Sequence, residues 1–167
     1  MKPTIYLDAD ACPVTAEALA VARACQVPAV IAGNSTQNLA RHLRRGDPRT
    51  PTGGFWVDTL PVGVDADAAD FAIVQELQPG DIVVTQDIGL AAMALGRRAR
   101  AIGVRRRVFT LATIDLDLHI RHEEKKVRRQ GGRTRGPAPF EDDDRERFAA
   151  NLRRLVEESL RDGEREH

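Results

Sequence analysis

The chain has 167 residues, of which 42% are hydrophobic and 30% are charged, and its 25 basic and 25 acidic side chains give a formal net charge of zero. This composition is typical of a single soluble globular domain, and a chain of this length can bury a core without disulfides or structural zinc. No apolar run approaches the roughly 20 residues that cross a bilayer, which excludes a membrane protein, and no leader peptide is expected. Cys12 and Cys25 lack zinc-knuckle spacing, so we interpret them as reduced thiols of a cytoplasmic protein.

The first two thirds of the sequence alternate between short apolar segments and helical patterns. In chain order we expect a strand at 4–7, a helix at 14–25, a strand at 27–32, a helix at 36–45, a loop at 46–54, a strand at 55–62, a helix at 66–77, a strand at 82–85, a helix at 88–98 and a strand at 101–104. Pro13 suits the first position of a helix. The alternation predicts an α/β fold, in which a mainly parallel sheet lies between two layers of helices.

The last third is more polar. We expect a charged helix at 113–130, a glycine-rich loop at 131–137, and a final helix that begins near 141–144 and ends before Gly163. The final helix has an acidic first turn, which suits the helix dipole. Its apolar stripe comprises Phe148, Leu152, Leu155, Val156 and Leu160. The stripe predicts that this helix, at about 141–162, docks on a single domain that spans residues 1–167.

Polar side chains follow several of the expected strands. Asp8, Asp10, Asn34 and Asp87 each stand just after one. In parallel α/β folds the functional site lies beyond the carboxyl ends of the strands, so we expect these side chains to share a site. Asp8 and Asp10 are two residues apart and should point to the same side, where their carboxylates could bind Mg²⁺ or Mn²⁺. The alternative is that one of them, Asp10 in particular, caps the following helix.

Two acidic segments later in the chain, one around residues 67–70 and one at residue 87, contain candidates for the same site. Asp67 and Asp70 are three residues apart and share a helix face, although an acidic first turn would also favour aspartate there. Asp87 follows the clearest buried strand, with Thr85 on the same side of it. Asp87 could equally be the N-cap of the next helix. Asp81 begins that strand, at the end opposite Asp87, and is interpreted as structural.

Charge is unevenly distributed along the chain. Between residues 51 and 96 there is no Lys or Arg, although seven acidic side chains lie in that stretch. Basic runs follow at 97–107 and 121–135. Carboxylates without local partners repel one another unless they are solvated or bridged by a cation. The basic runs suit an anionic substrate such as nucleic acid, although solvated helix faces would account for about half of these charges.

Taken together, three segments resemble the YaiI/YqxD family of bacterial proteins. They are Asp8-Ala-Asp-Ala-Cys-Pro13, Asp67-Ala-Ala-Asp70 with Ile73-Val74, and Gly80-Asp-Ile-Val-Val-Thr-Gln-Asp87 with Leu90-Ala91. A glycine-rich segment at 132–137 and a closing pattern of Asp144, Phe148 and Leu152 extend the resemblance over nearly the whole chain, with Arg135 where a second glycine is expected. The resemblance implies a PIN-like domain, a fold typical of Mg²⁺- or Mn²⁺-dependent nucleases, and the activity is therefore an analogy. The implied metal-site carboxylates are Asp8, Asp10, Asp70 and Asp87, with Asn34, Asp67 and Thr85 as supporting groups.

We therefore expect metal-assisted hydrolysis of phosphodiester bonds in RNA or single-stranded nucleic acid, with Arg105, Arg106 and Arg133 holding the backbone of the substrate. One rival is a phosphatase of the haloacid-dehalogenase type, which also uses D-x-D after its first strand. That chemistry needs a lysine after its second motif, and no lysine lies between Lys2 and Lys125. The other rival is a non-catalytic metal- or RNA-binding module. The chain could also form a homodimer, which the sequence neither indicates nor excludes.

Overall fold

The computed structural model of the chain describes residues 2–8, 13–33, 55–61, 68–105, 108–129 and 140–165. Several predictions fall on residues outside these ranges. They are the helix at 36–45, the loops at 46–54 and 131–137, and the site residues Asp10, Asn34, Asp67, Arg106 and Arg133. Asp70 lies within a described helix, but its side chain is not described.

The described strands form one sheet. They are β1 (Ile5–Asp8), β2 (Ala29–Gly33), β3 (Val57–Pro61), β4 (Ile82–Val84), β5 (Arg100–Ile102) and β6 (Val108–Phe109). The sheet order is β3-β2-β1-β4-β5-β6, and every neighbouring pair is parallel except β5 and β6. The predicted, mainly parallel sheet is therefore confirmed. The antiparallel β6 was not predicted, because two residues are too few to produce a recognisable pattern.

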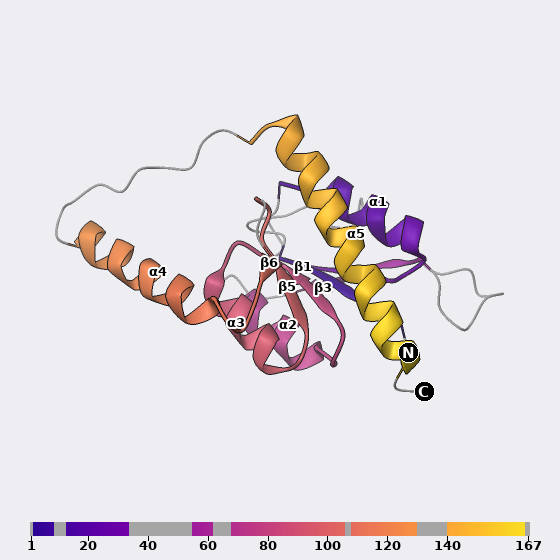
Figure 1. The fold of residues 1–167 in the computed structure, drawn as a ribbon, viewed down its shortest axis with the longest axis horizontal. Coiled ribbons are helices and arrows are strands. Elements are labelled where there is room, and N and C mark those ends of the chain that lie inside the picture. Colours follow the sequence, from indigo (N-terminus) through magenta and orange to yellow (C-terminus); the bar gives the residue numbers. More distant parts are fainter. Residues whose placement is uncertain are drawn as a thin grey trace.

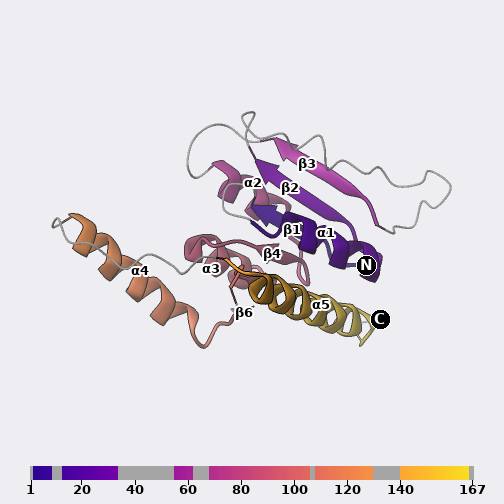
Figure 2. The ribbon, with the colours of Figure 1, turned by 90° about the horizontal axis from the view of Figure 1, so that it is seen from above.

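Helices cover both faces of this sheet (Figures 1 and 2). They are α1 (Thr15–Cys25), α2 (Ala68–Glu76), α3 (Ile88–Gly96), α4 (Ile114–Arg129) and α5 (Asp142–Arg165). Side chains of α1 and α5 pack on one face, and those of α2, α3 and the start of α4 pack on the other. The predicted three-layer α/β/α sandwich is confirmed. In the parts of the chain that the structure describes, none of the helices has the length and apolar character that a membrane crossing requires.

One boundary in the tail differs from the prediction. The last helix does not end before Gly163 but continues to Arg165. Its final turns contact the body of the domain, because Arg100 of β5 pairs with Glu158 and Asp162. A glycine inside a helix costs only about 1 kcal/mol, so Gly163 does not have to end α5.

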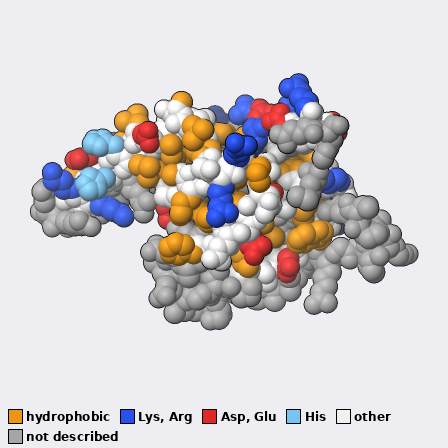
Figure 3. Space-filling view, turned by 90° about the horizontal axis from the view of Figure 1, so that it is seen from below, with side chains coloured by type: hydrophobic (Ala, Val, Ile, Leu, Met, Phe, Trp, Pro, Cys, Tyr) orange, Lys and Arg blue, Asp and Glu red, His pale blue; other side chains and the backbone are white. Residues whose placement is uncertain are grey.

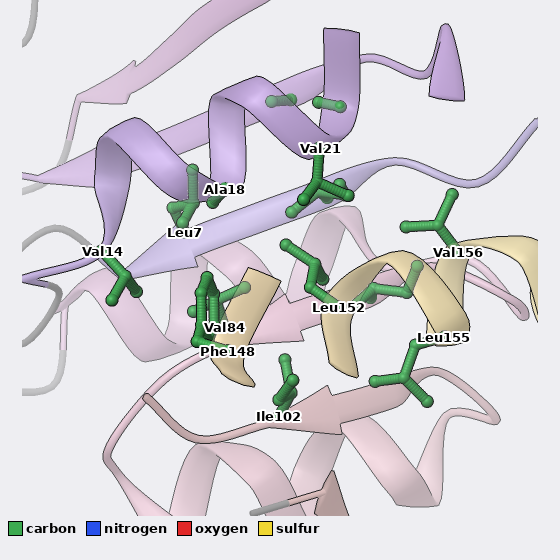
Figure 4. Close-up of a cluster of buried hydrophobic side chains, with 14 of the residues drawn as sticks. Leu7, Val14, Ala18, Val21, Val84, Ile102, Phe148, Leu152, Leu155 and Val156 are labelled. Carbon is green, nitrogen blue, oxygen red and sulfur yellow. The ribbon is translucent and has the colours of Figure 1, made fainter. Parts of the chain in front are cut away.

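The core has two halves, one on each face of the sheet, because successive residues of a strand point to opposite faces. Ile5 and Leu7 of β1 belong to the cluster under α1 and α5, whereas Tyr6 belongs to the cluster under α2 and α3. In β4, Val84 and Val83 divide in the same way. Figure 4 shows the first cluster, in which Phe148, Leu152, Leu155 and Val156 of α5 meet Val14, Ala18 and Val21 near α1 and Leu7, Val84 and Ile102 of the sheet. Because successive strand residues alternate between faces, Asp8 and Thr85 belong to the side of α2 and α3.

Candidate functional site

Asp8 and Thr85 lie where the strand order reverses. The chain runs outward from β1 to β2 and β3, and then returns to β4 on the other side of β1. The crevice outside the carboxyl ends of two such strands is the usual ligand site of an open α/β sheet. Asp8 is the last residue of β1, and Thr85 follows the last residue of β4. The predicted strand ends therefore meet at one place.

A short hydrogen-bond chain fixes these groups. The Thr85 hydroxyl donates to Asp8 Oδ2 over 3.3 Å and accepts from the backbone N–H of Asp87 over 2.9 Å. Asp8 is 5% exposed and Thr85 is 1% exposed. Because a buried carboxylate is costly without polar partners, the Thr85 hydroxyl stabilises Asp8 in this position. Thr85 thus connects the ends of β1 and β4 through side-chain chemistry as well as through the sheet.

Asp87 is the N-cap of α3. Its Oδ1 accepts from the backbone N–H of Gly89 over 2.8 Å and from that of Leu90 over 3.4 Å. The helix-capping interpretation of Asp87 is therefore correct. Capping by one oxygen does not preclude a metal role for the carboxylate, and that role stays a prediction.

Asp70 is the third residue of the described part of α2. The helix packs on the same side of the sheet as α3, through Ile73 and through Leu77, which directly follows the helix. The backbone thus brings the start of α2 and the start of α3 to the side on which Asp8 and Thr85 lie. Of the four predicted metal ligands, Asp8 and Asp87 have described side chains.

The donor chemistry of the described groups fits a hard cation. Two carboxylates and one hydroxyl offer oxygen atoms only, which is the donor type that Mg²⁺ and Mn²⁺ prefer. Within the described residues there is no group of three or more His, Cys, Asp or Glu side chains that could hold a metal ion. A complete ligand set would therefore need Asp10 or Asp70, which lie outside the described residues or have an undescribed side chain.

Arg105 stands three residues after β5, at the same edge of the sheet as Asp8. Its guanidinium lies 5.2 Å from the centre of the Phe140 ring, and the guanidinium of Arg145 lies 4.9 Å from the same ring. This stacking gives Arg105 a structural contact with the segment that leads into α5. Its predicted contact with nucleic acid stays a prediction.

Arg145 is a residue that sequence reasoning did not single out. It donates to the backbone carbonyl of Pro13 over 2.9 Å and to Glu17 Oε1 over 3.2 Å. Pro13 directly follows the segment that carries Asp10. Arg145 therefore fixes the chain where it leaves the acidic segment, and it does so from more than 120 residues away. No local pattern signals a contact of that kind.

The opposite edge of the sheet contains a buried aspartate with a different role. Asp81 Oδ1 accepts from the Thr4 backbone N–H over 2.9 Å, and Oδ2 accepts from that of Gln78 over 2.8 Å. Burial raises the pKa of Asp81, and these two hydrogen bonds lower it in part. The structural interpretation of Asp81 is confirmed. It lines a cavity of about 580 Å³ with Lys2, Tyr6 and Arg98, away from the carboxyl edge.

The three-layer sandwich, with a buried aspartate where the strand order reverses, is an α/β domain consistent with the PIN-like class. Residues 6–158 match the family described as uncharacterized BCR, YaiI/YqxD family, and the chain belongs to that family. It is 40% identical to a UPF0178 protein of Exiguobacterium sibiricum over 92% of this chain and 96% of the relative. It is 39% identical to a UPF0178 protein of Bacillus pumilus, over 92% and 86% of the two chains. A Clostridium acetobutylicum UPF0178 protein is 37% identical, over 91% and 95%. No solved structure matches the chain.

Proposed function

We propose that the chain is a divalent-metal-dependent nuclease of PIN-like type that hydrolyses phosphodiester bonds in RNA or single-stranded nucleic acid. One observation carries the proposal: Asp8 is buried and hydrogen-bonded to Thr85 where the strand order reverses. Helix α2 contains Asp70, and helix α3 directly follows Asp87. Both helices pack on the same side of the sheet. A buried carboxylate at such a crevice is a functional-site candidate rather than a requirement of the fold.

The ligands of the metal in this proposal are the four aspartates at positions 8, 10, 70 and 87. When bound, Mg²⁺ or Mn²⁺ would supply charge neutralisation at the scissile phosphate and a more acidic water. Thr85 holds the Asp8 carboxylate in place through its hydroxyl group. Asn34 and Asp67 are assigned supporting roles at the same edge.

The substrate in this proposal is an anionic strand whose phosphates contact Arg105, Arg106 and Arg133. Contacts of this kind position a nucleic acid but do not read its sequence. Residues 51–96 of the sequence contain seven acidic side chains and no Lys or Arg, and a bound cation would supply positive charge to the aspartates of the site. We place the activity in the cytoplasm, an assignment with which the free thiol of Cys25 is compatible.

The test is cleavage of labelled RNA and single-stranded DNA oligonucleotides by the purified chain with Mn²⁺. We expect Asp10→Asn and Asp8→Asn each to reduce the rate about a hundredfold or more, since even the outer neighbours of metal ligands are worth ten- to hundredfold. Asp87→Asn is especially informative, because asparagine caps helices as well as aspartate does. A loss of activity with unchanged stability in that variant would therefore report the lost charge.

The matched control is Asp81→Asn. Asp81 is a buried aspartate that directly precedes β4, at the end of that strand opposite Asp87. It should change stability and leave the rate unchanged. Full activity in both Asp10→Asn and Asp8→Asn would overturn the proposal. Turnover of a generic aryl phosphate instead of oligonucleotides would favour the phosphatase, and Mn²⁺ binding without any turnover would favour a non-catalytic module.

A further inference from the structure

A cavity of about 580 Å³ lies at the amino edge of the sheet, at the ends of β1 and β4 opposite Asp8 and Thr85. It is enclosed by the start of the chain, the turn before β4, the segment between α3 and β5, and the last turns of α5. Figures 1 and 2 both show the start of the chain beside the end of α5. A cavity of this volume is large enough for a small organic molecule. Its charged lining side chains are Lys2, Asp81, Arg98, Arg100 and Asp162.

Arg98 occupies a backbone position that favours glycine. It directly follows the C-cap of α3 and has a φ of 64°, in the left-handed region. Its N–H donates to the Leu95 carbonyl over 3.1 Å, and the N–H of Ala99 donates to the Ala94 carbonyl over 3.0 Å. This pair of hydrogen bonds commonly closes a helix, and glycine is the usual left-handed residue there because a Cβ is disfavoured at positive φ. An arginine at this position therefore lowers stability.

No contact of the Arg98 side chain within the described residues compensates for this cost. Gln26 also has a positive φ, but its side chain donates to the Arg23 carbonyl over 2.7 Å. In the described part of the chain, the Arg98 side chain makes neither a hydrogen bond nor an ion pair. Its exposure alone is unremarkable, since Figure 3 shows described basic side chains scattered over one face of the molecule. A disfavoured backbone conformation in a residue whose side chain lines a cavity points to a function for that side chain.

The two acidic side chains at the cavity already have partners. Asp162 is paired with Arg100, which also pairs with Glu158. Asp81 is 5% exposed and accepts one backbone N–H group on each of its carboxylate oxygens. These partners reduce the repulsion that either carboxylate would exert on an anion in the cavity.

The remaining two basic side chains lack acidic partners among the described residues. Lys2 donates to the backbone carbonyl of Gln26 over 3.1 Å, and this neutral acceptor does not compensate its charge. The guanidinium of Arg98 is a planar fork of donors, which suits the oxygens of phosphate and carboxylate groups. Two uncompensated positive charges match a phosphate monoester, which carries a charge of about −1.5 to −2 at pH 7.

We propose that this cavity binds a small phosphate monoester, and that Arg98 and Lys2 bind its phosphate group. The organic part of the ligand occupies the rest of the cavity, between the turn before β4 and α5. The site lies at the edge of the sheet opposite the candidate metal site, and the inference does not depend on the proposed nuclease activity. Arg98 thus supplies a ligand contact at the expense of backbone stability.

Thermal unfolding of the full chain with glycerol 3-phosphate, inorganic phosphate or glycerol tests the proposal. Both phosphate probes should raise the Tm of the wild type in a saturable way, because a ligand that binds only the folded chain stabilises it. Glycerol 3-phosphate should bind more tightly than inorganic phosphate, and glycerol at the same concentrations should have no effect. Lys2→Gln should weaken the affinity for glycerol 3-phosphate about tenfold.

Arg98→Gly separates the two effects of this residue. Because glycine adopts positive φ without a steric penalty, the Tm without probe should rise by about 2–4 °C, whereas the saturable shift with either phosphate probe should be lost. Arg97→Ala is the matched control, since Arg97 is exposed but does not line the cavity, and it should keep the full shift.

A wild-type chain that neither phosphate probe stabilises would overturn the proposal. A shift that persists in Arg98→Gly would be a general salt effect and would overturn it too, as would an equal loss of the shift in Arg97→Ala.

Discussion

Single residues in this protein show how one type of side chain takes different roles at the two edges of one sheet. Asp81 accepts two backbone N–H groups before β4, whereas Asp8 accepts the Thr85 hydroxyl at the end of β1. Sequence order predicts which end of a strand each residue occupies, and this was sufficient to separate them. It could not separate capping from metal binding at Asp87, because both roles select a short carboxylate at the start of a helix.

Tyr6 allows a direct measurement at this scale, because it is the only tyrosine of the chain. Burial, with smaller effects from the negative charges of Asp81 and Glu76, raises its pKa from 10.0 to about 12. Above pH 10 the unfolded chain releases the proton that the folded chain retains, so the free energy of unfolding should fall between pH 10 and about 12.

The measurement is a titration that follows the ultraviolet absorbance of tyrosinate in the folded and the urea-unfolded chain. We expect the midpoint of the folded chain to lie well above that of the unfolded chain. Tyr6→Phe should lack this part of the alkaline loss of stability. Equal midpoints in the two states would contradict the burial of the hydroxyl group.

At the scale of elements, the periodic spacing of hydrophobic residues was the feature of the sequence that predicted strands and helices reliably. The run Ile82–Val84 and the stripe of α5 were both predictable, because burial on both faces or along one stripe leaves a clear pattern. The end of α5 was not predictable, since a glycine such as Gly163 lowers helix stability by only about 1 kcal/mol and does not by itself end a helix. The link from Arg145 to Pro13 could not be predicted either, because its partners are distant in sequence.

The docking of α5 leads to a prediction about stability. Leu152 is fully buried between α1 and the sheet (Figure 4). Leu152→Ala should lower the free energy of unfolding by about 2–5 kcal/mol, through lost apolar burial and the cavity that remains. Urea denaturation measures it, with Leu111→Ala as the control, since Leu111 is 70% exposed. Similar small losses in both variants would show that α5 is not part of the cooperative core.

At the scale of the whole molecule, the sandwich depends on its last element to close one face. Helix α5 provides Phe148, Leu152, Leu155 and Val156 to the cluster that also contains Leu7. The first 140 residues contain every described strand, yet they leave that side of the sheet partly uncovered. The chain therefore cannot complete its core until its last element is present.

We accordingly expect that a chain truncated after residue 140 retains secondary structure but loses fixed packing. The exposed apolar face should bind the dye ANS, and the near-ultraviolet circular dichroism of the chain should be lost. Addition of a synthetic peptide covering residues 141–165 should restore part of that signal. Cooperative unfolding of the truncated chain, with the m-value expected for its length, would contradict this view of α5.

The borders of the sheet have a consequence for aggregation. An edge strand offers unpaired backbone groups to any passing chain, and fibrils grow from such edges. On one border β6 is only two residues long and runs antiparallel to β5. On the other, β3 contains the exposed Asp58, whose Oδ1 accepts the Thr59 backbone N–H over 2.8 Å, and Pro61, which has no N–H to offer. Both borders are thus poor templates for a foreign strand, which limits pairing of one sheet with another in a crowded cell.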